Sequence, residues 1–441
     1  MSDQATKPEI HSIQTPATVE LGETGISIRH RRSRSLVFRL LERLEHASLT
    51  VQEGHRELHF GTEGASHRAQ MRVHDSRAYR LMATGGSIGA GEAYELGFWD
   101  SNDLTGLLAV FAANREMLAA LEGPVARLLS PLLKLAHAFN RNTVTGSRRN
   151  IAAHYDLGNE FFAAFLDESM MYSAAIFEKE SESLEQAQQR KLHRICQALD
   201  LGPEDHLLEI GTGWGGLAIF AARHYGCQVT TTTISREQYE LACQRVSEAG
   251  LSERISLLLK DYRELDGRYN KLVSIEMIEA IGHQYLGTYF HQCDRLLSDD
   301  GLMLLQAITI EDYRYRQALN SVDYIKRYIF PGCFIPSVAA LSDAIAKHSR
   351  LRMIHLDDIG PSYATTLASW HQRLLDKAEH IRAMGYPDEF LRRWRFYLSY
   401  CEAGFSERAL GDVQVLLAKP NNRRAQWLGQ IRSKPQTQRS L

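Results

Sequence analysis

The sequence predicts an α/β protein built around a doubly wound, Rossmann-like sheet. From about residue 205 onward, short apolar runs alternate with amphipathic stretches of about 10–15 residues, a pattern typical of strands joined by crossover helices. A glycine-rich turn, "GTGWGG", follows the first apolar run and leads into a helix-like stretch. In a doubly wound sheet this turn lies at the carboxyl edge of the strands, where ligands bind.

The composition is that of a globular chain without membrane spans. The 441 residues include 44% hydrophobic and 24% charged side chains, with a net charge of −2, which is ordinary for soluble proteins. No run approaches the ~18 consecutive apolar residues of a transmembrane helix. The polar N-terminus lacks the apolar centre of a signal peptide. Six scattered cysteines without a CxxC pair suit a reducing cytoplasm and predict neither disulfides nor a metal site.

The expected elements of the larger domain follow one another in order. Strand "HLLEIGTG", helix "GGLAIFAARHYG", strand "QVTTTTIS" and helix "REQYELACQRVSEAG" open it. Strands "ISLLLKDY", "NKLVSIEM" and "GLMLLQAITI" come next, and "DVQVLLAKP" is expected as the last. Nearer the N-terminus, "ELHFGTEG" and "AQMRVHD" also read as strands, ahead of the glycine- and aromatic-rich "GGSIGAGEAYELGFWD". A smaller α+β domain is therefore expected before the sheet domain.

These patterns divide the chain into five segments. We expect a disordered N-terminus (1–25), a small separate domain (26–135), a linker (136–149), the sheet domain (150–420) and a flexible basic tail (421–441).

A basic amphipathic helix is expected near Arg29–His46, at the start of the small domain. Leu36, Leu40, Leu41 and Leu44 share one face at helical spacing, and arginines lie off that face. Such a helix either lies in a membrane interface or packs as a surface helix on its own domain. The pattern leaves both interpretations open.

The glycine-rich loop does not match the phosphate-binding motifs. It lacks the GxxxxGK[ST] pattern of a P-loop, and its G-x-G-x-G-G spacing differs from the dinucleotide fingerprint, which also expects an acid about 20 residues further on. An acid, Glu209, stands directly before the glycines instead. Together with "TISREQ", "KDYREL" and "SIEMIEAIG" after successive strands, this arrangement favours S-adenosylmethionine as the ligand.

With these motifs in order, the chain resembles the cyclopropane fatty acid synthase family of S-adenosylmethionine-dependent enzymes. The supporting stretches are "NIAAHYDLGNEFFAAFLDESMMYS", "LEIGTGWGGLAIFAA", "EMIEAIG", "YIFPGCFIPS" and "WRFYLSYCEAGF", over about residues 148–420. The resemblance implies a class I methyltransferase domain with a smaller N-terminal domain on the lipid side, which "GEAYELGFWD" also resembles.

The resemblance also implies which residues bind the cofactor. Tyr172 and Ser173 line it, Gly211 and Gly213 lie under its methionine part, and Glu209 precedes them. Three residues match the ribose side and two the adenine side, in this order: Thr233, Ile234, Gln238, Tyr262 and Arg263.

In the family, a methyl group adds to a lipid double bond, and a bound bicarbonate then removes a proton from the resulting carbocation. Cysteine, glutamate, histidine and tyrosine side chains hold the bicarbonate. Glu279 and Tyr397 match the glutamate and the tyrosine, but Ala174 and Gln306 replace the cysteine and the histidine. Alanine has no polar side chain and glutamine does not titrate, so bicarbonate is in question. Glu279 is expected to act directly if burial raises its pKa, with Tyr397 and Gln306 beside it.

The altered site favours a methyl- or methylene-branched product over a cyclopropane ring, which stays the alternative. A catalytically silent lipid-binding homologue and a methyltransferase for soluble acceptors are further alternatives. A nucleic-acid substrate is not expected, because "EMIEAIG" stands where the tetrapeptide of amino-group methyltransferases would be. The implied partner is a phospholipid bilayer with unsaturated chains, reached from the cytoplasm at the inner face of the membrane. A homodimer stays open.

Overall fold

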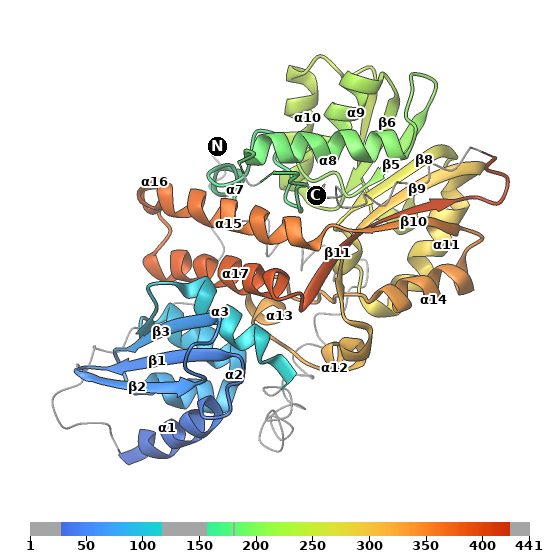
Figure 1. Cartoon of the computed structure of the whole chain (residues 1–441). Coiled ribbons are helices and arrows are strands. Elements are labelled where there is room, and N and C mark those ends of the chain that lie inside the picture. Colours follow the sequence, from blue (N-terminus) through green and yellow to red (C-terminus); the bar gives the residue numbers. More distant parts are fainter. Residues whose placement is uncertain (1–27, 117–156, 180, 424–441) are drawn as a thin grey trace, which may run out of the picture.

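The computed structural model describes residues 28–116, 157–179 and 181–423. Two sheets dominate it: a four-stranded sheet near the N-terminus and a seven-stranded sheet in the larger domain (Figure 1). Helices α15 (Gly360–Asp376) and α17 (Asp388–Ser406) lie between the two sheets. The predicted segments 1–25 and 136–149, and most of the tail, lie outside the described residues.

The larger sheet has the strand order β10-β11-β9-β8-β5-β6-β7. Strands β7, β6, β5, β8 and β9 are mutually parallel, whereas β11 runs antiparallel to β9 and β10. The chain enters the sheet at its centre and winds outward on both sides, which confirms the predicted doubly wound fold. The strands are β5 (His206–Ile210), β6 (Gln228–Thr233), β7 (Ile255–Leu259), β8 (Tyr269–Ile275), β9 (Leu297–Ile310), β10 (Arg352–Asp358) and β11 (Leu410–Ala418).

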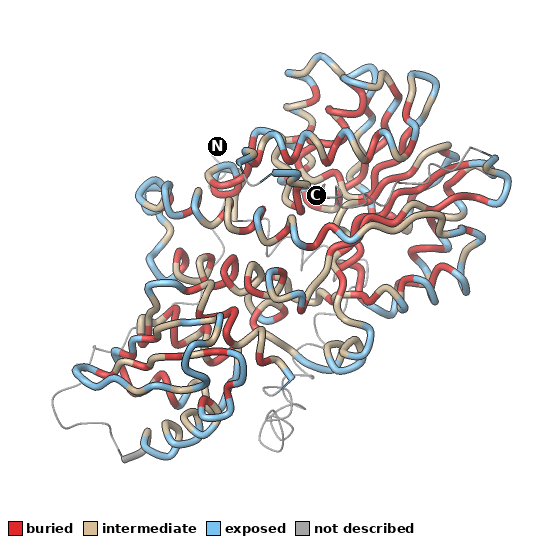
Figure 2. Tube along the Cα trace, in the orientation of Figure 1, coloured by how far each residue is buried: buried red, intermediate tan, exposed pale blue. Residues whose placement is uncertain are grey.

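Helices cover both faces of this sheet because its strands alternate apolar side chains toward each face. Leu207 and Leu304 pack with helices α8 to α10, whereas Leu208 and Leu305 pack with α11 and α14. The buried strands run between these layers (Figure 2). The helices are α7 (Asn159–Ala163), α8 (Leu184–Ala198), α9 (Gly216–Tyr225), α10 (Arg236–Glu248), α11 (Leu286–Leu296), α12 (Tyr315–Leu319), α13 (Tyr324–Tyr328), α14 (Val338–His348) and α16 (Ala378–Ala383), with single 3-10 turns η1 (Tyr262–Glu264), η2 (Ile278–Ala280), η3 (His283–Tyr285) and η4 (Asp312–Arg314).

The N-terminal domain is a small α+β unit, as the sequence predicts. Its sheet has the order β2-β1-β3-β4, and its long helix α2 is kinked at Gly86, where φ is +54°. The elements are α1 (Ile28–Leu41), β1 (Ala47–Glu53), β2 (Arg56–Gly61), β3 (His67–Val73), α2 (Arg77–Glu95), β4 (Trp99–Asp100) and α3 (Leu104–Ala113).

Two expectations for the first helix are wrong. The basic helix, expected to extend to His46, ends at Leu41, and the following residues turn into strand β1, which alternates buried and half-buried side chains. The expected leucine face also differs, because Leu36 is 45% exposed while Leu41 is buried. Phe38, which packs against Tyr79 of α2, takes the place of Leu36 on the inner face. A helix that packs on its own domain therefore still presents arginines and one leucine to solvent.

The two domains share one continuous apolar core rather than meeting across a polar boundary. Tyr94 and Trp99 of the small domain pack against Phe396 on α17. Arg393 of the same helix forms an ion pair with Glu95, at 2.8 Å. Tyr324 donates a hydrogen bond to that glutamate, at 2.5 Å. Helix α17 thus belongs to the core of both domains.

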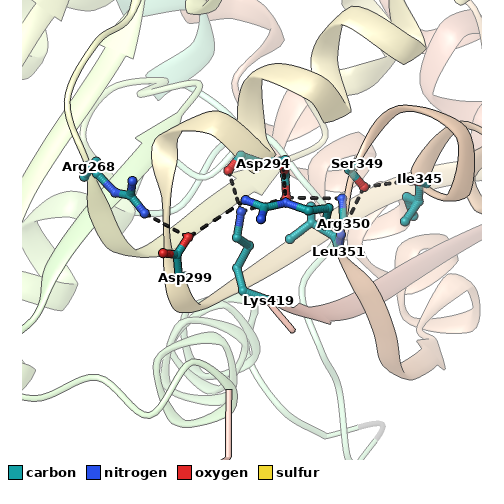
Figure 3. Close-up of polar contacts among 8 residues, drawn as sticks. All are labelled: Arg268, Asp294, Asp299, Ile345, Ser349, Arg350, Leu351 and Lys419. Atoms are coloured by element: carbon teal, nitrogen blue, oxygen red, sulfur yellow. Dashed lines mark hydrogen bonds and ion pairs between the residues drawn. The ribbon is translucent and has the colours of Figure 1, made fainter. Parts of the chain in front are cut away.

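Charged groups tie together the opposite, amino-terminal edge of the large sheet (Figure 3). The Lys419 side chain is 1% exposed, and its ammonium lies 2.8 Å from the Asp294 carboxylate at the end of α11. Arg350 contacts Asp294 and Asp299, and Arg268 contacts Asp299. This cluster joins α11, β9 and β11 far from the carboxyl edge, so its role is to hold the sheet.

We predict that Gly91→Ala destabilises the protein. A Cβ at Gly91 would lie 2.3 Å from the ring of Tyr324, which is fully buried and fixed by its hydrogen bond to Glu95. Overpacking of this kind lowers the free energy of unfolding by about 1–3 kcal/mol, measurable by denaturant unfolding. Gly85→Ala on the same helix is the control, since a Cβ there meets open space. Equal stability of the two variants would contradict the packing described.

Candidate active site

The turn that follows β5 requires glycine. Gly211 has φ +105° and Gly215 has φ +84°, values that residues with a Cβ rarely adopt. A Cβ at Gly211 would also lie 3.2 Å from the side chain of Met277. The backbone of the turn is consequently bare where β5 ends and α9 begins, and a ligand can approach it closely.

A cavity lies at this carboxyl edge, and it collects every residue predicted to bind the cofactor. The segment before α8, the ends of β5, β6 and β7, and the turn after β8 all contribute to its wall. The ten predicted residues that line it are Tyr172, Ser173, Glu209, Gly211, Gly213, Thr233, Ile234, Gln238, Tyr262 and Arg263. Their individual roles stay predictions.

Polar side chains are ordered at the end of β6. The Thr233 hydroxyl donates to the Gln238 amide oxygen at 2.9 Å, and it accepts from the backbone N–H of Ser235 at 3.1 Å. Ser235 in turn caps the start of α10. The orientation of Gln238 toward the cavity is thereby fixed before any ligand binds.

One carboxylate oxygen of Glu209 is held by the neighbouring strand. The residue is 3% exposed, and its Oε2 accepts a 2.6 Å hydrogen bond from the Thr231 hydroxyl of the neighbouring strand. Burial raises its pKa to about 8. One of its two oxygens is therefore already engaged within the sheet, although the residue still lines the cavity.

Asp261 was missed by the sequence reasoning, although it stands directly before two predicted residues at the end of β7. It is 2% exposed and lines the cavity. Its carboxylate accepts from the backbone N–H of Arg263 and from the guanidinium, at 2.7–3.0 Å. Tyr262 packs edge-on against Tyr289, and its buried hydroxyl has no hydrogen-bond partner among the described residues.

These features fit S-adenosylmethionine. The bare glycine backbone suits its methionine part, Gln238 and Glu209 offer hydrogen bonds, and Tyr262 offers an aromatic face with an unpartnered hydroxyl. No cluster of three or more His, Cys, Asp or Glu side chains suited to a metal ion occurs among residues 28–116, 157–179 and 181–423.

Glu279 lies next to this cavity, in η2. Its Oε1 accepts a 2.7 Å hydrogen bond from the backbone N–H of Ile308, while its buried Oε2 has no partner in the described part of the chain. Burial, together with the nearby Glu276 carboxylate, raises the pKa of Glu279 to about 8. A carboxylate with one fixed and one open oxygen can accept a proton near neutral pH.

A second carboxylate, Glu276, forms the polar centre of the site and was also missed. It lines the cavity and accepts hydrogen bonds from Ala174 N, from Gln306 Nε2 and from the Tyr363 hydroxyl, at 2.8, 2.8 and 2.7 Å. Gln306 also donates to the buried Asp412, at 3.0 Å. The available signal was a second acid in "SIEMIEAIG", three residues before Glu279.

The residues present do not fit a bound bicarbonate. Both N–H groups of the Gln306 amide are used by Glu276 and Asp412, and its oxygen accepts from Gln414 at 3.0 Å. The backbone N–H of Ala174 is likewise used by Glu276. The two positions that depart from the family pattern are therefore both committed to a carboxylate of the chain itself.

Tyr397 joins the cavity to an aromatic cluster. Its hydroxyl lies 2.9 Å from that of Tyr172, which lines the cofactor cavity. Tyr172 packs against Trp370, and Tyr397 against Trp394 and Phe330. None of the predicted trio Glu279, Tyr397 and Gln306 lines the cofactor cavity. Tyr397 and Gln306 each contact a residue that does, Tyr172 and Glu276 respectively.

A separate, open groove of about 910 Å³ lies beyond η3, between α11, α12 and α14. It is lined by polar residues that include His283, His291 and Arg316. None of the predicted cofactor or catalytic residues lines it.

Comparison with known proteins identifies the relatives of this arrangement. The sequence model of the mycolic acid cyclopropane synthetase family matches residues 142–415 of this chain. The chain belongs to this family. The tuberculostearic acid methyltransferase UfaA1 of Mycobacterium tuberculosis is 38% identical over 347 residues, which cover 77% of this chain and 81% of that protein. The cyclopropane-fatty-acyl-phospholipid synthase of Escherichia coli is 34% identical over 353 residues, covering 80% and 88%.

Solved structures of the family share the fold. The cyclopropane synthase MmaA2 from Mycobacterium tuberculosis superposes with a TM-score of 0.58 at 28% identity, covering 62% of this chain and 98% of that one. The mycolic acid cyclopropane synthase CmaA1, complexed with SAH and CTAB, gives the same values. The chain is accordingly an S-adenosylmethionine-dependent enzyme that transfers one-carbon groups, and the expected cofactor and family are confirmed.

We predict that Gln238→Leu weakens the binding of S-adenosylmethionine about 10-fold. The change removes an amide that Thr233 holds toward the cavity, and one hydrogen bond contributes about 0.5–1.5 kcal/mol. Isothermal titration calorimetry measures the Kd. Gln244→Leu, on the exposed side of the same helix, is the matched control. An unchanged Kd for Gln238→Leu would rule out its assignment to the cofactor.

Proposed function

We propose that this enzyme adds one carbon to the double bond of an unsaturated acyl chain in a membrane phospholipid and gives a methyl- or methylene-branched chain. Its place in the family supports the modification of unsaturated lipid chains. The product assignment rests on the group beside the cavity that can accept a proton, which is the half-free carboxyl of Glu279. Two of the four bicarbonate ligands of the family, the cysteine and the histidine, are replaced by Ala174 and Gln306.

When bound, S-adenosylmethionine supplies a methyl group on a positively charged sulfur, which is a strong electrophile. The glycine turn and the walls from β6 and β7 hold it in a fixed orientation, and alignment of two reactants lowers the barrier by several kcal/mol. One alkene carbon takes the methyl group as the sulfur–methyl bond breaks and S-adenosylhomocysteine is released, and the neighbouring carbon becomes a carbocation.

The aromatic cluster then serves two purposes. Tyr172 packs against Trp370 and Tyr397 against Trp394, at ring-centroid distances of 5.3 and 5.4 Å. Phe162 packs against both Tyr172 and Trp394, and this apolar surrounding keeps water from quenching the cation. An aromatic face also stabilises a cation by about 0.5–2 kcal/mol.

Glu279 is the proton acceptor in this scheme. The backbone amide of Ile308 holds Oε1 of Glu279. Because Ile308 packs against the same apolar cluster as Tyr172 and Tyr397, we assign the open Oε2 of Glu279 to the side of the acyl chain. A hydride shift moves the positive charge to the methyl-bearing carbon, and loss of a methyl proton to Glu279 leaves a methylene branch. A saturated methyl branch requires a subsequent hydride donor, and direct closure to a cyclopropane ring is the alternative outcome.

The lipid substrate requires contact with a membrane, and helix α1 supports such contact. No helix in the described ranges is long and apolar enough to span a bilayer. The outer side of α1 exposes Arg31, Arg32, Arg39 and Leu36, a combination suited to an anionic surface. We place the enzyme at the inner face of the cytoplasmic membrane, as a peripheral protein.

We predict that the rate of lipid methylation rises with pH and levels off above about pH 8. Glu279 accepts a proton only when ionised, and burial raises its pKa to about 8, so activity is lost as the pH falls below that value. Glu279→Gln lowers kcat by about 10²–10⁴-fold, the usual contribution of a general base. Transfer of labelled methyl groups into unsaturated phospholipid vesicles, followed by mass spectrometry of the fatty esters, measures rate and product. A cyclopropane as the sole product would overturn the branching proposal.

We also predict that Arg31→Ala with Arg32→Ala weakens binding to anionic vesicles about 30-fold at low salt, because each arginine near such a surface contributes about 1 kcal/mol. Flotation of the protein with vesicles measures the partition coefficient. Arg268→Ala, an exposed arginine of the large domain, is the control. If vesicle binding changes neither with salt nor with the two α1 substitutions, α1 does not form the membrane contact.

A further inference from the structure

The interior behind Glu276 holds more charge than the proposed reaction requires. Lys191 on α8 and Asp412 on β11 are both 0% exposed, yet neither lines the cofactor cavity. Burial of charged groups is unfavourable unless they compensate one another. Their arrangement around Glu276 therefore calls for a function.

Glu276 itself is locked in place by reciprocal hydrogen bonds. Its backbone N–H donates to the Gln306 carbonyl at 2.9 Å, and the Gln306 amide donates to its side chain at 2.8 Å. Its φ is +46°, a left-handed conformation that is rare and unfavourable outside glycine. The fold thus sustains local strain in order to present this carboxylate at the cavity wall.

Asp412 shares the donor of Glu276. The Gln306 Nε2 lies 2.8 Å from Glu276 Oε1 and 3.0 Å from Asp412 Oδ2, so the two carboxyl groups are neighbours. Two buried carboxyl groups this close cannot both be ionised, and one of them keeps a proton. Burial and the charges of Glu276 and Glu279 raise the pKa of Asp412 well above its ordinary value. Asp412 therefore holds the proton of this pair, which makes it a donor beside Glu276.

Lys191 supplies the positive charge. Its ammonium donates to the Ser173 hydroxyl at 2.6 Å, one residue before the backbone N–H of Ala174 that holds Glu276. The charged groups that interact with it are Glu276, Asp412 and Asp167. Burial raises the pKa of Glu276 above its ordinary value, and Tyr363, Lys191, Ala174 and Asp412 each oppose that rise.

We propose that the carboxylate of Glu276 takes the place of the dissociable bicarbonate ion that the family uses. Lys191 and Asp412 are positioning residues that keep Glu276 ionised and directed at the cavity. The inference rests on the proposed function, because the negative charge acts on the carbocation formed there. Glu276 has both of its oxygens engaged by the donors of Ala174, Gln306 and Tyr363. It stabilises the cation electrostatically and leaves proton removal to Glu279.

The first test removes the carboxylate without straining the backbone. Glu276→Gly suits a φ of +46° and leaves the donors of Ala174, Gln306 and Tyr363 facing an empty space. We expect kcat for methyl transfer to fall at least about 100-fold, as when a preorganised charge is lost, with an unchanged Kd for S-adenosylmethionine. Added sodium formate or bicarbonate, as a small anionic probe, raises kcat of this variant by at least about 10-fold. A fully active Glu276→Gly enzyme, or one that neither anion rescues, overturns the proposal.

The wild-type enzyme provides the complementary measurement. Its rate in buffer depleted of carbon dioxide should equal the rate with added bicarbonate within about two-fold, since the anion is part of the chain. A loss of about 10-fold or more on depletion contradicts the inference. A wild-type enzyme that transfers no methyl group to unsaturated phospholipid vesicles refutes the proposed function instead, so the two failures are distinguishable.

The positioning residues are tested by matched pairs. Asp412→Asn keeps a donor toward Glu276 and Asp412→Leu removes it, so we expect the asparagine variant to be at least about 10-fold more active. Lys191→Met raises the pKa of Glu276, whose other charged or titratable neighbours are Glu279, Asp412 and Tyr363. The loss of kcat in the Lys191→Met variant should be largest at low pH and become smaller as the pH rises. An equal loss at every pH, or equal activity of the two Asp412 variants, would mean a merely structural role.

Discussion

A charge that is buried must be surrounded by donors, and the carboxylate of Glu276 obtains them from separate parts of the chain. The segment before α8 provides the Ala174 amide, β9 provides Gln306 and α15 provides Tyr363. Each donor has to lie within hydrogen-bond distance, because an unsatisfied buried charge is strongly destabilising. This requirement fixes the position of α15 and of the Ala174 segment relative to the sheet. The cofactor cavity and the aromatic cluster therefore depend on the hydrogen bonds to Glu276.

Two carboxylates three residues apart have different chemistry because their surroundings differ. Glu276 has three hydrogen-bond donors on its two oxygens, whereas Glu279 has one donor and an open oxygen. A carboxylate with both oxygens held by donors is stabilised in its charged form, whereas an open oxygen is free to accept a proton. In the proposed mechanism the same residue type therefore serves as a fixed charge at one position and as a proton acceptor at the other.

Helix α17 links the N-terminal domain to the candidate active site. Phe396 packs with Tyr94 and Trp99 of the small domain, while the adjacent Tyr397 reaches Tyr172 at the cavity. Since neighbouring residues on a helix point in different directions, one helix serves both contacts. The packing of the small domain consequently helps to set the position of a residue at the active site.

The sequence by itself determined strands β5 to β9 and β11 and the glycine turn, because these depend on local periodicity and on motifs of a few residues. The resemblance located the residues that line the cofactor cavity, together with Glu279, Gln306 and Tyr397. Only the tertiary structure decided that Leu36 is exposed, that β1 follows α1 directly, and that Glu276, Asp412 and Lys191 meet. Lys191 lies on one face of a helix and Asp412 begins the buried part of a strand, and neither position carries a local signal. The sharing of donors arises from contacts between residues far apart in the chain, such as Ala174 with Glu276 and Gln306 with Asp412, and no short stretch of sequence contains them.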